Sequence, residues 1–190
     1  DLIAGAQARE AQMVDTGAKD MGEKPETLDK FAEAIARCRA CPIGELENRA
    51  VMGEGPRTAP LMIVGEQPGD QEDVTGRPFV GPAGQLLDEY LQRAGIDRGE
   101  AYVTNAVKHF KYAPRGKRRL HQSPAAKEID TCRWWLEAER DLVKSRVILA
   151  LGASAARGLL GRTVSISKVR GEPMPLEGGA ELWVTAHPSY

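Results

Sequence analysis

The polar side chains best suited to chemistry follow short apolar segments of the chain. They are Glu66, Gln67, Asn105 and His187. A carboxylate or an imidazole can move protons and stabilise charge, and a side-chain amide offers both donors and an acceptor. Apolar segments of this kind are typical of buried strands, and ligands of parallel α/β sheets bind where the carboxyl ends of the strands meet. We therefore expect these side chains to converge on one site.

A second candidate is a basic stretch between Asn105 and Gln122 that contains no acidic residue, although the chain as a whole has a formal net charge of −1. Its cations are Lys108, Lys111, Arg115, Lys117, Arg118 and Arg119. Such a stretch is either a solvated, flexible loop or a surface that neutralises phosphates. His121 lies at its end and, taken alone, is more typical of a surface histidine than of a catalytic one.

The three cysteines, Cys38, Cys41 and Cys132, form a third candidate. An odd number, in a chain with no signal peptide, argues against a framework of disulfides. The C-x-x-C spacing of Cys38 and Cys41 indicates a metal or redox site, whose other ligands must come from elsewhere in the chain.

The elements that must position these residues alternate between strands and helices. The expected strands are residues 61–64, 102–107, 147–151 and 182–185, and the expected helices are residues 26–37, 82–95, 124–144 and 153–160. Ser123 is expected as the N-cap of the third helix with Pro124 as its first residue. Residues 65–73 are expected to form a loop, residues 163–175 an irregular or hairpin-like segment, and Leu86, Leu87, Tyr90 and Leu91 an inner helix face. This alternation predicts an α/β sandwich with a mostly parallel central sheet.

Length and composition fit one soluble domain, expected over residues 25–190 after a loosely ordered lead-in over residues 1–24. Of 190 residues, 42% are hydrophobic and 28% are charged. No apolar run approaches the roughly 20 residues that span a bilayer, and no secretory signal is recognisable. We expect a cytoplasmic location with no membrane partner. Because the chain begins at Asp1 rather than Met, it is expected to be a piece of a longer protein or a trimmed one.

Four segments, in this order and spacing, resemble the uracil-DNA glycosylase superfamily, nearest its iron–sulfur branch. They read Gly-Glu-Gln-Pro-Gly from Gly65, Gly-Arg-Pro-Phe-Val-Gly-Pro-Ala-Gly from Gly76, Thr-Asn-Ala-Val-Lys from Thr104 and His-Pro-Ser from His187. The run Lys-Arg-Arg-Leu-His that ends at His121 is similar to that of the UdgX group, whose members bind uracil-containing DNA and become covalently attached to it. The resemblance covers residues 38–189 and implies a three-layer sandwich, with a further helix after Tyr190.

The resemblance implies a role for each candidate residue. Phe79 would stack on a flipped uracil, Asn105 and Gln67 would contact its polar edge, and His187 would donate to its oxygen as negative charge develops. His121 would attack the sugar, and Glu66 would stabilise the sugar cation or take the proton that His121 loses. As a neutral amide, Gln67 is a poor base for activating water. Contacts to DNA would come from Lys117, Arg118, Arg119 and Ser189, with Asp70 and Asp73 bracing the loops through Arg118 or Arg119.

The resemblance also implies a 4Fe–4S cluster held by Cys38, Cys41, His109 and Cys132, with histidine in place of the usual third cysteine. A structural zinc ion on the same three thiolates and one imidazole is the alternative.

Three functions are compatible with these residues. The first is excision of uracil from DNA, single-stranded DNA included, followed by covalent attachment through His121, with the protein acting once as a monomer. The second is an ordinary uracil-DNA glycosylase that turns over. The third is a non-catalytic DNA-binding module with a structural metal.

Overall fold

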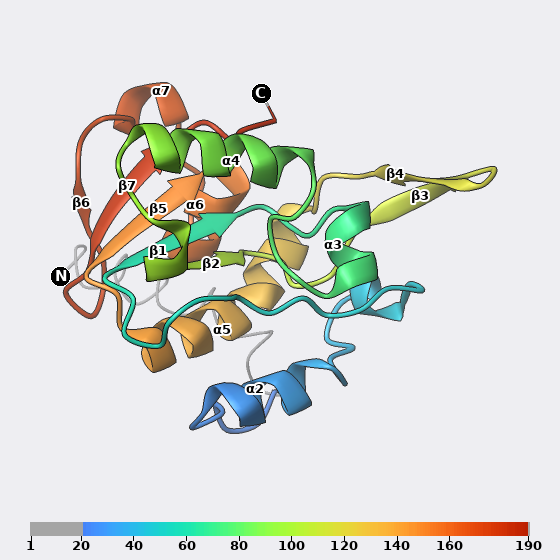
Figure 1. The fold of residues 1–190 in the computed structure, drawn as a ribbon. Helices are drawn as coiled ribbons and strands as arrows, with labels where there is room; N and C mark the ends of the chain where they lie inside the picture. The colour runs from blue at the N-terminus through green and yellow to red at the C-terminus, as the bar shows by residue number, and fades with distance from the viewer. Residues whose placement is uncertain (1–20, 190) are drawn as a thin grey trace, which may run out of the picture.

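A five-stranded sheet forms the centre of the computed structural model, which describes residues 21–189 (Figure 1). The strand order is β2 (Ala101–Asn105), β1 (Leu61–Gly65), β5 (Val147–Leu151), β7 (Glu181–Thr185) and β6 (Met174–Pro175). The first four are parallel, and only the short β6 runs antiparallel to its neighbour. The predicted mostly parallel sheet is therefore confirmed.

Alternation along the strands explains why both faces of the sheet are covered by helices. Successive side chains of a strand point to opposite faces. Met62 and Val64 of β1 pack in a cluster with α6 (Ala153–Leu160) and α5 (Ala126–Val143), whereas Ile63 packs with Leu87 and Leu91 of α4 (Pro82–Arg93). The result is three layers, with α4 on one face and α5 and α6 on the other (Figure 1).

A third apolar cluster joins the beginning of the described chain to the outer side of α5. It contains Phe31 and Ile35 of α2 (Leu28–Ile35), Ile43 of η1 (Pro42–Glu45), and Ile129 and Trp135 of α5. The predicted helix at residues 26–37 is confirmed with a later start, because the side chain of Thr27 caps the helix by accepting the Lys30 N–H.

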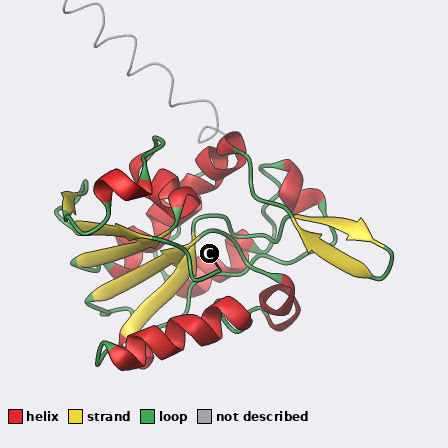
Figure 2. Cartoon of the chain, turned by 90° about the horizontal axis from the view of Figure 1, so that it is seen from above, coloured by secondary structure: helices red, strands yellow, loops and turns green. Residues whose placement is uncertain are grey.

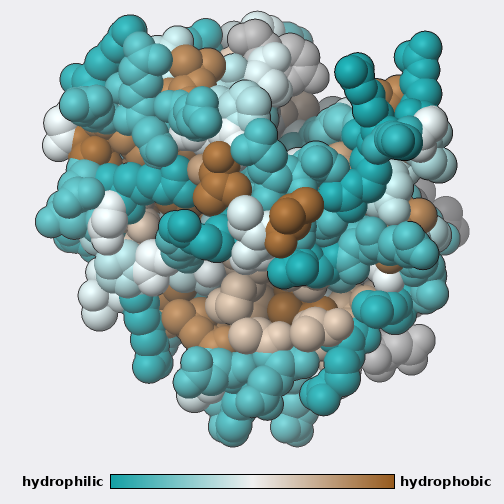
Figure 3. Space-filling model, turned by 45° about the vertical axis from the view of Figure 1, so that its right-hand side comes forward, coloured by the Kyte–Doolittle hydropathy of each residue, from teal (hydrophilic) through white to brown (hydrophobic). Residues whose placement is uncertain are grey.

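The basic stretch forms an antiparallel hairpin, β3 (Tyr112–Arg115) and β4 (Arg118–His121), rather than a flexible loop. This hairpin projects from the body of the molecule (Figure 2). Hydrophilic side chains dominate the surface on this side, with smaller apolar areas between them (Figure 3). An isolated two-stranded hairpin is marginally stable in water, so contacts at its base must hold it in place.

Four local predictions differ from the structure. Residues 70–73 of the expected loop belong to helix α3 (Asp70–Thr75), and part of the segment expected to be irregular forms α7 (Ile166–Val169). Helix α5 begins at Ala126, because the Glu128 side chain accepts the Ala125 N–H and fixes the N-terminus there instead of at Ser123. Tyr90 is 55% exposed, outside the inner face of α4, and its ring packs against Arg93.

The expected lead-in, residues 1–24, falls almost entirely outside the described residues. Within residues 21–189, no helix combines the length and apolar character needed to cross a bilayer. The short helix η2 (Arg98–Glu100) links α4 to β2 and begins at Arg98.

Candidate active site

A cavity of about 510 Å³ lies beyond the carboxyl ends of the central strands. The register places Gly65 beside Asn105 and Leu151 beside Thr185, so the residues that follow each strand share one edge. The predicted side chains that line the cavity are Glu66, Gln67, Phe79, Asn105, His121, His187 and Ser189. The predicted convergence at this edge is confirmed.

Gly65 allows the two expected base-contacting residues to lie next to each other. A Cβ atom at this position would overlap the Phe79 ring and would lie 2.6 Å from Oδ1 of Asn105. The Phe79 ring is buried, and its centroid lies 6.3 Å from that of His187. The cavity therefore has an apolar ring and a buried amide side by side.

Glu66 is held at both carboxylate oxygens. Its Oε1 lies 3.2 Å from Nε2 of His121, and its Oε2 accepts a hydrogen bond from the Ser154 hydroxyl at 2.6 Å. Burial works to raise the pKa of Glu66, but the hydrogen bonds from His121 and Ser154 outweigh it and bring the pKa below its ordinary value. Glu66 is thus a carboxylate at neutral pH, aimed at the imidazole of His121.

His187 has a defined tautomer. Its Nδ1 accepts the backbone N–H of Ser189 at 3.2 Å, which places the ring proton on Nε2. Burial lowers the pKa of His187, against an opposing effect of Glu66, so the neutral ring prevails at neutral pH. A neutral imidazole of this kind presents one N–H donor to the cavity.

Gln67 is used to fasten the hairpin. Its Oε1 accepts the Lys111 N–H at 3.2 Å, and its Nε2 donates to the carbonyl of Gln122 at 3.0 Å and to that of Lys111 at 3.3 Å. The two residues flanking the hairpin are therefore joined to the end of β1. The side-chain amide that was expected to read uracil is engaged with backbone in this structure, and its contact to a base stays a prediction.

Arg119 holds the hairpin to α3. Its guanidinium pairs with Asp70 at 2.7 Å and with Asp73 at 2.6 Å, and it lies over the ring of Tyr112. Arg119 and His121 are two residues apart in β4, so their side chains share a face of the hairpin, and the contacts of Arg119 help to orient His121 towards the cavity. The expected bracing by Asp70 and Asp73 is confirmed for Arg119. Its contact to phosphate, like those of Lys117 and Arg118, stays a prediction.

Lys108 does not belong to the basic surface, which corrects the expectation drawn from its charge. It is fully buried and forms an ion pair with Glu139, which is also fully buried. Its ammonium also donates to the Thr104 hydroxyl and to the Asn105 carbonyl, each at 2.7 Å. Lys108 therefore fixes the strand end that carries Asn105.

The three cysteines belong to the apolar cluster that joins α2 to α5. Cys132 accepts the Lys108 N–H at 3.3 Å, and Cys38 accepts the Trp135 indole N–H at 3.2 Å. Burial raises the pKa of Cys132 to about 12 and raises that of Cys41, so a bound cation would be needed to keep these thiols ionised.

His109 has the features of a fourth donor. Its Nε2 is buried and has no hydrogen-bond partner within the described residues. Burial lowers its pKa to about 4, with a further contribution from Arg39, the residue after Cys38, so the ring is in the neutral form that binds metals. The donors thus suit a metal group in their chemistry. Within residues 21–189, however, no three His, Cys, Asp or Glu side chains are arranged to hold a metal ion.

Sequence reasoning missed Ser154, Glu72 and Arg98. Ser154 lies at the start of a helix, where serine is common, and nothing in its type marks a partner for Glu66. Glu72 and Arg98 bond mainly to backbone atoms of distant loops, which no residue pattern reveals.

Residues 52–190 match the family described as "Uracil DNA glycosylase superfamily". The chain is 40% identical over 171 residues to a Type-4 uracil-DNA glycosylase of Thermotoga maritima, a match that covers 90% of this chain and 85% of that protein. It is 38% identical over 169 residues to a Type-4 uracil-DNA glycosylase of Pyrobaculum aerophilum, with coverage of 85% and 83%. A Type-5 uracil-DNA glycosylase of Pyrobaculum aerophilum is 29% identical over 195 residues, with coverage of 85% and 82%.

Proposed function

This chain belongs to the uracil-DNA glycosylase superfamily, and from that premise we propose that it excises uracil from DNA and then captures the sugar through His121. Uracil inside a duplex must leave the base stack to be reached, at a cost of a few kcal/mol, and single-stranded DNA avoids most of that cost. We therefore propose uracil in single-stranded DNA as a substrate, with one copy of the chain as the active unit.

The cavity supports the excision step. The ring of Phe79 would stack on the base, and the Asn105 amide would pair with its polar edge, since an amide offers donors and an acceptor. When the bond from the base to the sugar C1′ breaks, its electron pair leaves with uracil. The Nε2–H of His187 would stabilise the charge that develops on the uracil oxygen.

The observation that carries the capture step is the 3.2 Å separation between Nε2 of His121 and Oε1 of Glu66 at the wall of the cavity. A carboxylate only accepts, so the ring nitrogen facing it carries the proton and the other keeps its lone pair. That lone pair would form a bond to C1′ as the base departs. The ring proton would pass to Glu66, leaving a neutral imidazole attached to the sugar.

Such an adduct should persist, because a neutral imidazole is a poor leaving group unless it is protonated again. A protein that forms it acts once. The hairpin contacts of Gln67 and Arg119 support this role for His121, since they hold a nucleophile beside the cavity in advance of the reaction.

Ordinary turnover, with water in place of His121, is the second candidate. The observation that favours it is the 40% identity to a protein named a Type-4 uracil-DNA glycosylase. In this case His121 would only orient DNA, and Glu66 would assist the water.

We further propose that Cys38, Cys41, His109 and Cys132 hold a 4Fe–4S cluster. When bound, it would supply a structural crosslink between the beginning of the described chain and α5. The alternative is a structural zinc ion on the same donors, which would have to lie within about 2.0–2.3 Å of one ion. A visible absorbance band from the purified protein supports the cluster, and a colourless protein with stoichiometric zinc contradicts it.

One experiment separates the candidate functions. The protein is incubated with single-stranded DNA that contains one uracil, and the products are run on a denaturing gel. We expect a slower band that survives boiling in detergent. Abasic DNA in molar excess over protein would instead support turnover, and intact DNA would overturn the assignment of excision in favour of a non-catalytic DNA-binding module.

A further inference from the structure

Phe79 has a backbone conformation that an aromatic residue rarely adopts. Its φ is 53°, in the left-handed region, where a Cβ atom is crowded and glycine is the usual occupant. A glycine would take this conformation freely but would leave the cavity without its ring. Bulky residues keep such a conformation only where their surroundings hold them in it.

Two side chains of opposite charge hold the backbone around Phe79. The Arg98 guanidinium donates to the carbonyls of Pro78 at 2.9 Å and Phe79 at 2.8 Å. The buried Glu72 carboxylate accepts the N–H groups of Val80 at 3.1 Å and Gly81 at 2.8 Å. The carbonyls of Pro78 and Phe79 and the two N–H groups that follow are therefore all fixed by hydrogen bonds to charged groups, which are the stronger kind.

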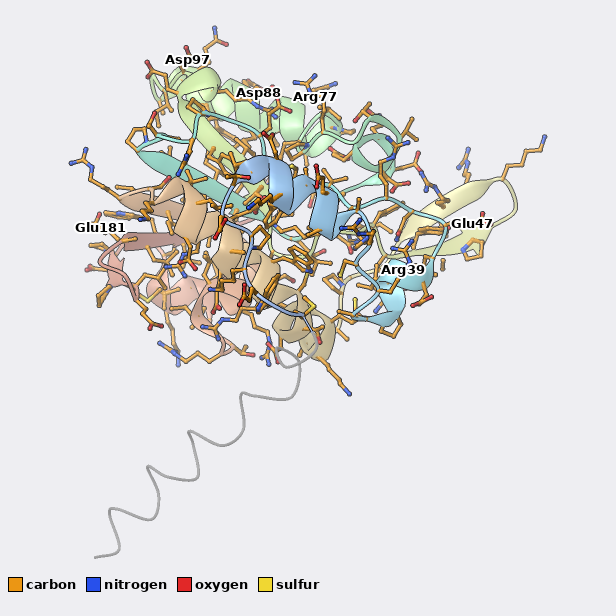
Figure 4. All side chains as sticks on the ribbon, turned by 90° about the horizontal axis from the view of Figure 1, so that it is seen from below. Arg39, Glu47, Arg77, Asp88, Asp97 and Glu181 are labelled. Carbon is orange, nitrogen blue, oxygen red and sulfur yellow. The ribbon has the colours of Figure 1, made fainter. Side chains whose placement is uncertain are left out.

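Both groups are themselves anchored. Arg98 also pairs with Asp88 of α4 at 2.7 Å. Asp88 lies along one edge of the molecule, between Asp97 and Arg77 (Figure 4). The other oxygen of Glu72 accepts the Gly69 N–H at 3.1 Å, which joins the loop after β1 to the Phe79 segment. The two loops that line the cavity thus meet at one carboxylate.

A close neighbour leaves Phe79 no room to relax. A Cβ atom at Gly84 would overlap the backbone carbonyl of Phe79, so the first turn of α4 packs directly against the strained residue.

We infer that Arg98 is a positioning residue for base recognition, acting with Glu72 to hold Phe79 in its left-handed conformation so that its ring is a preformed stacking surface for a pyrimidine. This inference rests on the proposed function. Arg98 lies in η2, away from the cavity wall, so it would act only through Phe79.

The test compares Arg98→Ala with Arg77→Ala. Arg77 is a matched control, because it is only two residues before Phe79 in the chain. Its guanidinium donates to the Glu54 carboxylate instead of to the strained segment. With protein in excess over uracil-containing DNA, we would measure the rate of uracil release and the concentration of free uracil that halves it. Arg98→Ala should slow release about tenfold and require about tenfold more free uracil, the size expected for the loss of a charged hydrogen-bonding group. Arg77→Ala should change each less than twofold.

A double-mutant cycle makes the readout specific to Phe79. In a Phe79→Ala background, Arg98→Ala should cause no further loss, because residues that act through one another are not additive. The rate of uracil release by Arg98→Lys should fall between the rates of wild type and Arg98→Ala. If Arg98→Ala does not fold, Arg98→Lys is compared with wild type in its place. Added guanidinium at millimolar concentration should restore part of the Arg98→Ala activity.

The outcomes separate the two claims. If wild type releases no uracil, the proposed function fails and this inference fails with it. If wild type releases uracil and Arg98→Ala or Arg98→Lys leaves both measurements unchanged, or if the effects of Arg98→Ala and Phe79→Ala add, only the inference is overturned.

Discussion

At the residue scale, contacts that occupy one atom of a side chain determine what its other atoms can do. The N–H of Ser189 occupies Nδ1 of His187 and leaves a single N–H donor for the base. Ser154 occupies one oxygen of Glu66 and leaves the other to face His121. The first contact uses a backbone N–H and the second the hydroxyl of a distant serine, so neither leaves a pattern in the sequence, yet each defines the chemistry of its neighbour.

Glu66→Gln should slow formation of the covalent adduct about 100-fold, because an amide cannot take the proton that His121 loses, and proton transfer by a positioned group contributes roughly 10²–10⁴-fold. The rate is measured by quenching the reaction with uracil-containing DNA into detergent. Ser154→Ala is the control: it keeps the carboxylate and removes one hydrogen bond, so the loss should stay below about tenfold. Wild-type rates for Glu66→Gln would remove Glu66 from the capture step.

The lowered pKa of His187 predicts how stability depends on pH. As the pH falls below the ordinary histidine value of 6.5, the unfolded chain takes up a proton before the folded protein does. The contribution of His187 to stability is therefore complete above about pH 6.5 and lost as the pH falls through its lowered folded value.

His187→Gln should abolish this loss. The free energy of unfolding of wild type minus that of the variant should be smaller at about pH 5 than at about pH 7.5, measured by urea unfolding. Ser189→Ala keeps the imidazole of His187 and should still lose this stability as the pH falls. An equal difference at both pH values would show that the His187 pKa is the same in the folded and unfolded chain.

At the element scale, the hairpin is a short structure that depends on the body for its orientation. Gln67 fastens its base, and Arg119 ties β4 to the carboxylates of α3. The contacts that orient His121 are therefore separate from those expected to bind the base, and the two can be disturbed independently.

Arg119→Ala should lower adduct yield about tenfold or more while uracil release continues, since a displacement near 1 Å can cost on the order of 100-fold in a reaction between positioned groups. Both products are read from one gel. Arg118→Ala is the matched control on the same strand, with an exposed side chain, and should keep the wild-type ratio of adduct to release. A proportional fall of both products in Arg119→Ala would mean that the hairpin serves excision itself.

The buried pair of Lys108 and Glu139 links the strand of Asn105 to α5. Removing one partner leaves the other charged and unpaired in the interior, which costs about 3–5 kcal/mol. We expect Glu139→Gln to lower the free energy of unfolding by about that amount in urea titrations, whereas Glu26→Gln, in an exposed pair, should leave stability nearly unchanged. A small effect for Glu139→Gln would contradict this account of the buried ion pair.

Periodicity and motifs were enough to predict the sheet, its parallel order and the edge at which the site lies, because buried strands and their polar ends leave a local signal. They were not enough to distinguish Lys108 from the exposed cations that follow it, since its burial depends on Glu139, 31 residues away. The hairpin was also missed, because the contacts that hold it against the body, made by Gln67 and Arg119, join segments far apart in the chain. Interactions between segments far apart in the chain account for both errors.

At the scale of the whole molecule, charge is distributed unevenly despite a formal net charge of −1. Lys117 and Arg118 lie on the projecting hairpin, and the cavity opens beside its base at His121. A negatively charged strand attracted to the hairpin would therefore meet the cavity next to it. The fold brings an electrostatic surface, a pocket for the base and a candidate nucleophile together at one edge of the sheet.

The central claim is that His121 forms a bond to the sugar once uracil has left. The most direct measurement is mass spectrometry of the protein after reaction with uracil-containing DNA, digestion of the DNA and cleavage with trypsin, which cuts after Arg119. We predict that the sugar remnant lies on His121 in the peptide that begins at Leu120, and that His121→Ser yields none. A remnant on another residue, or released uracil with no modified peptide, would contradict the account.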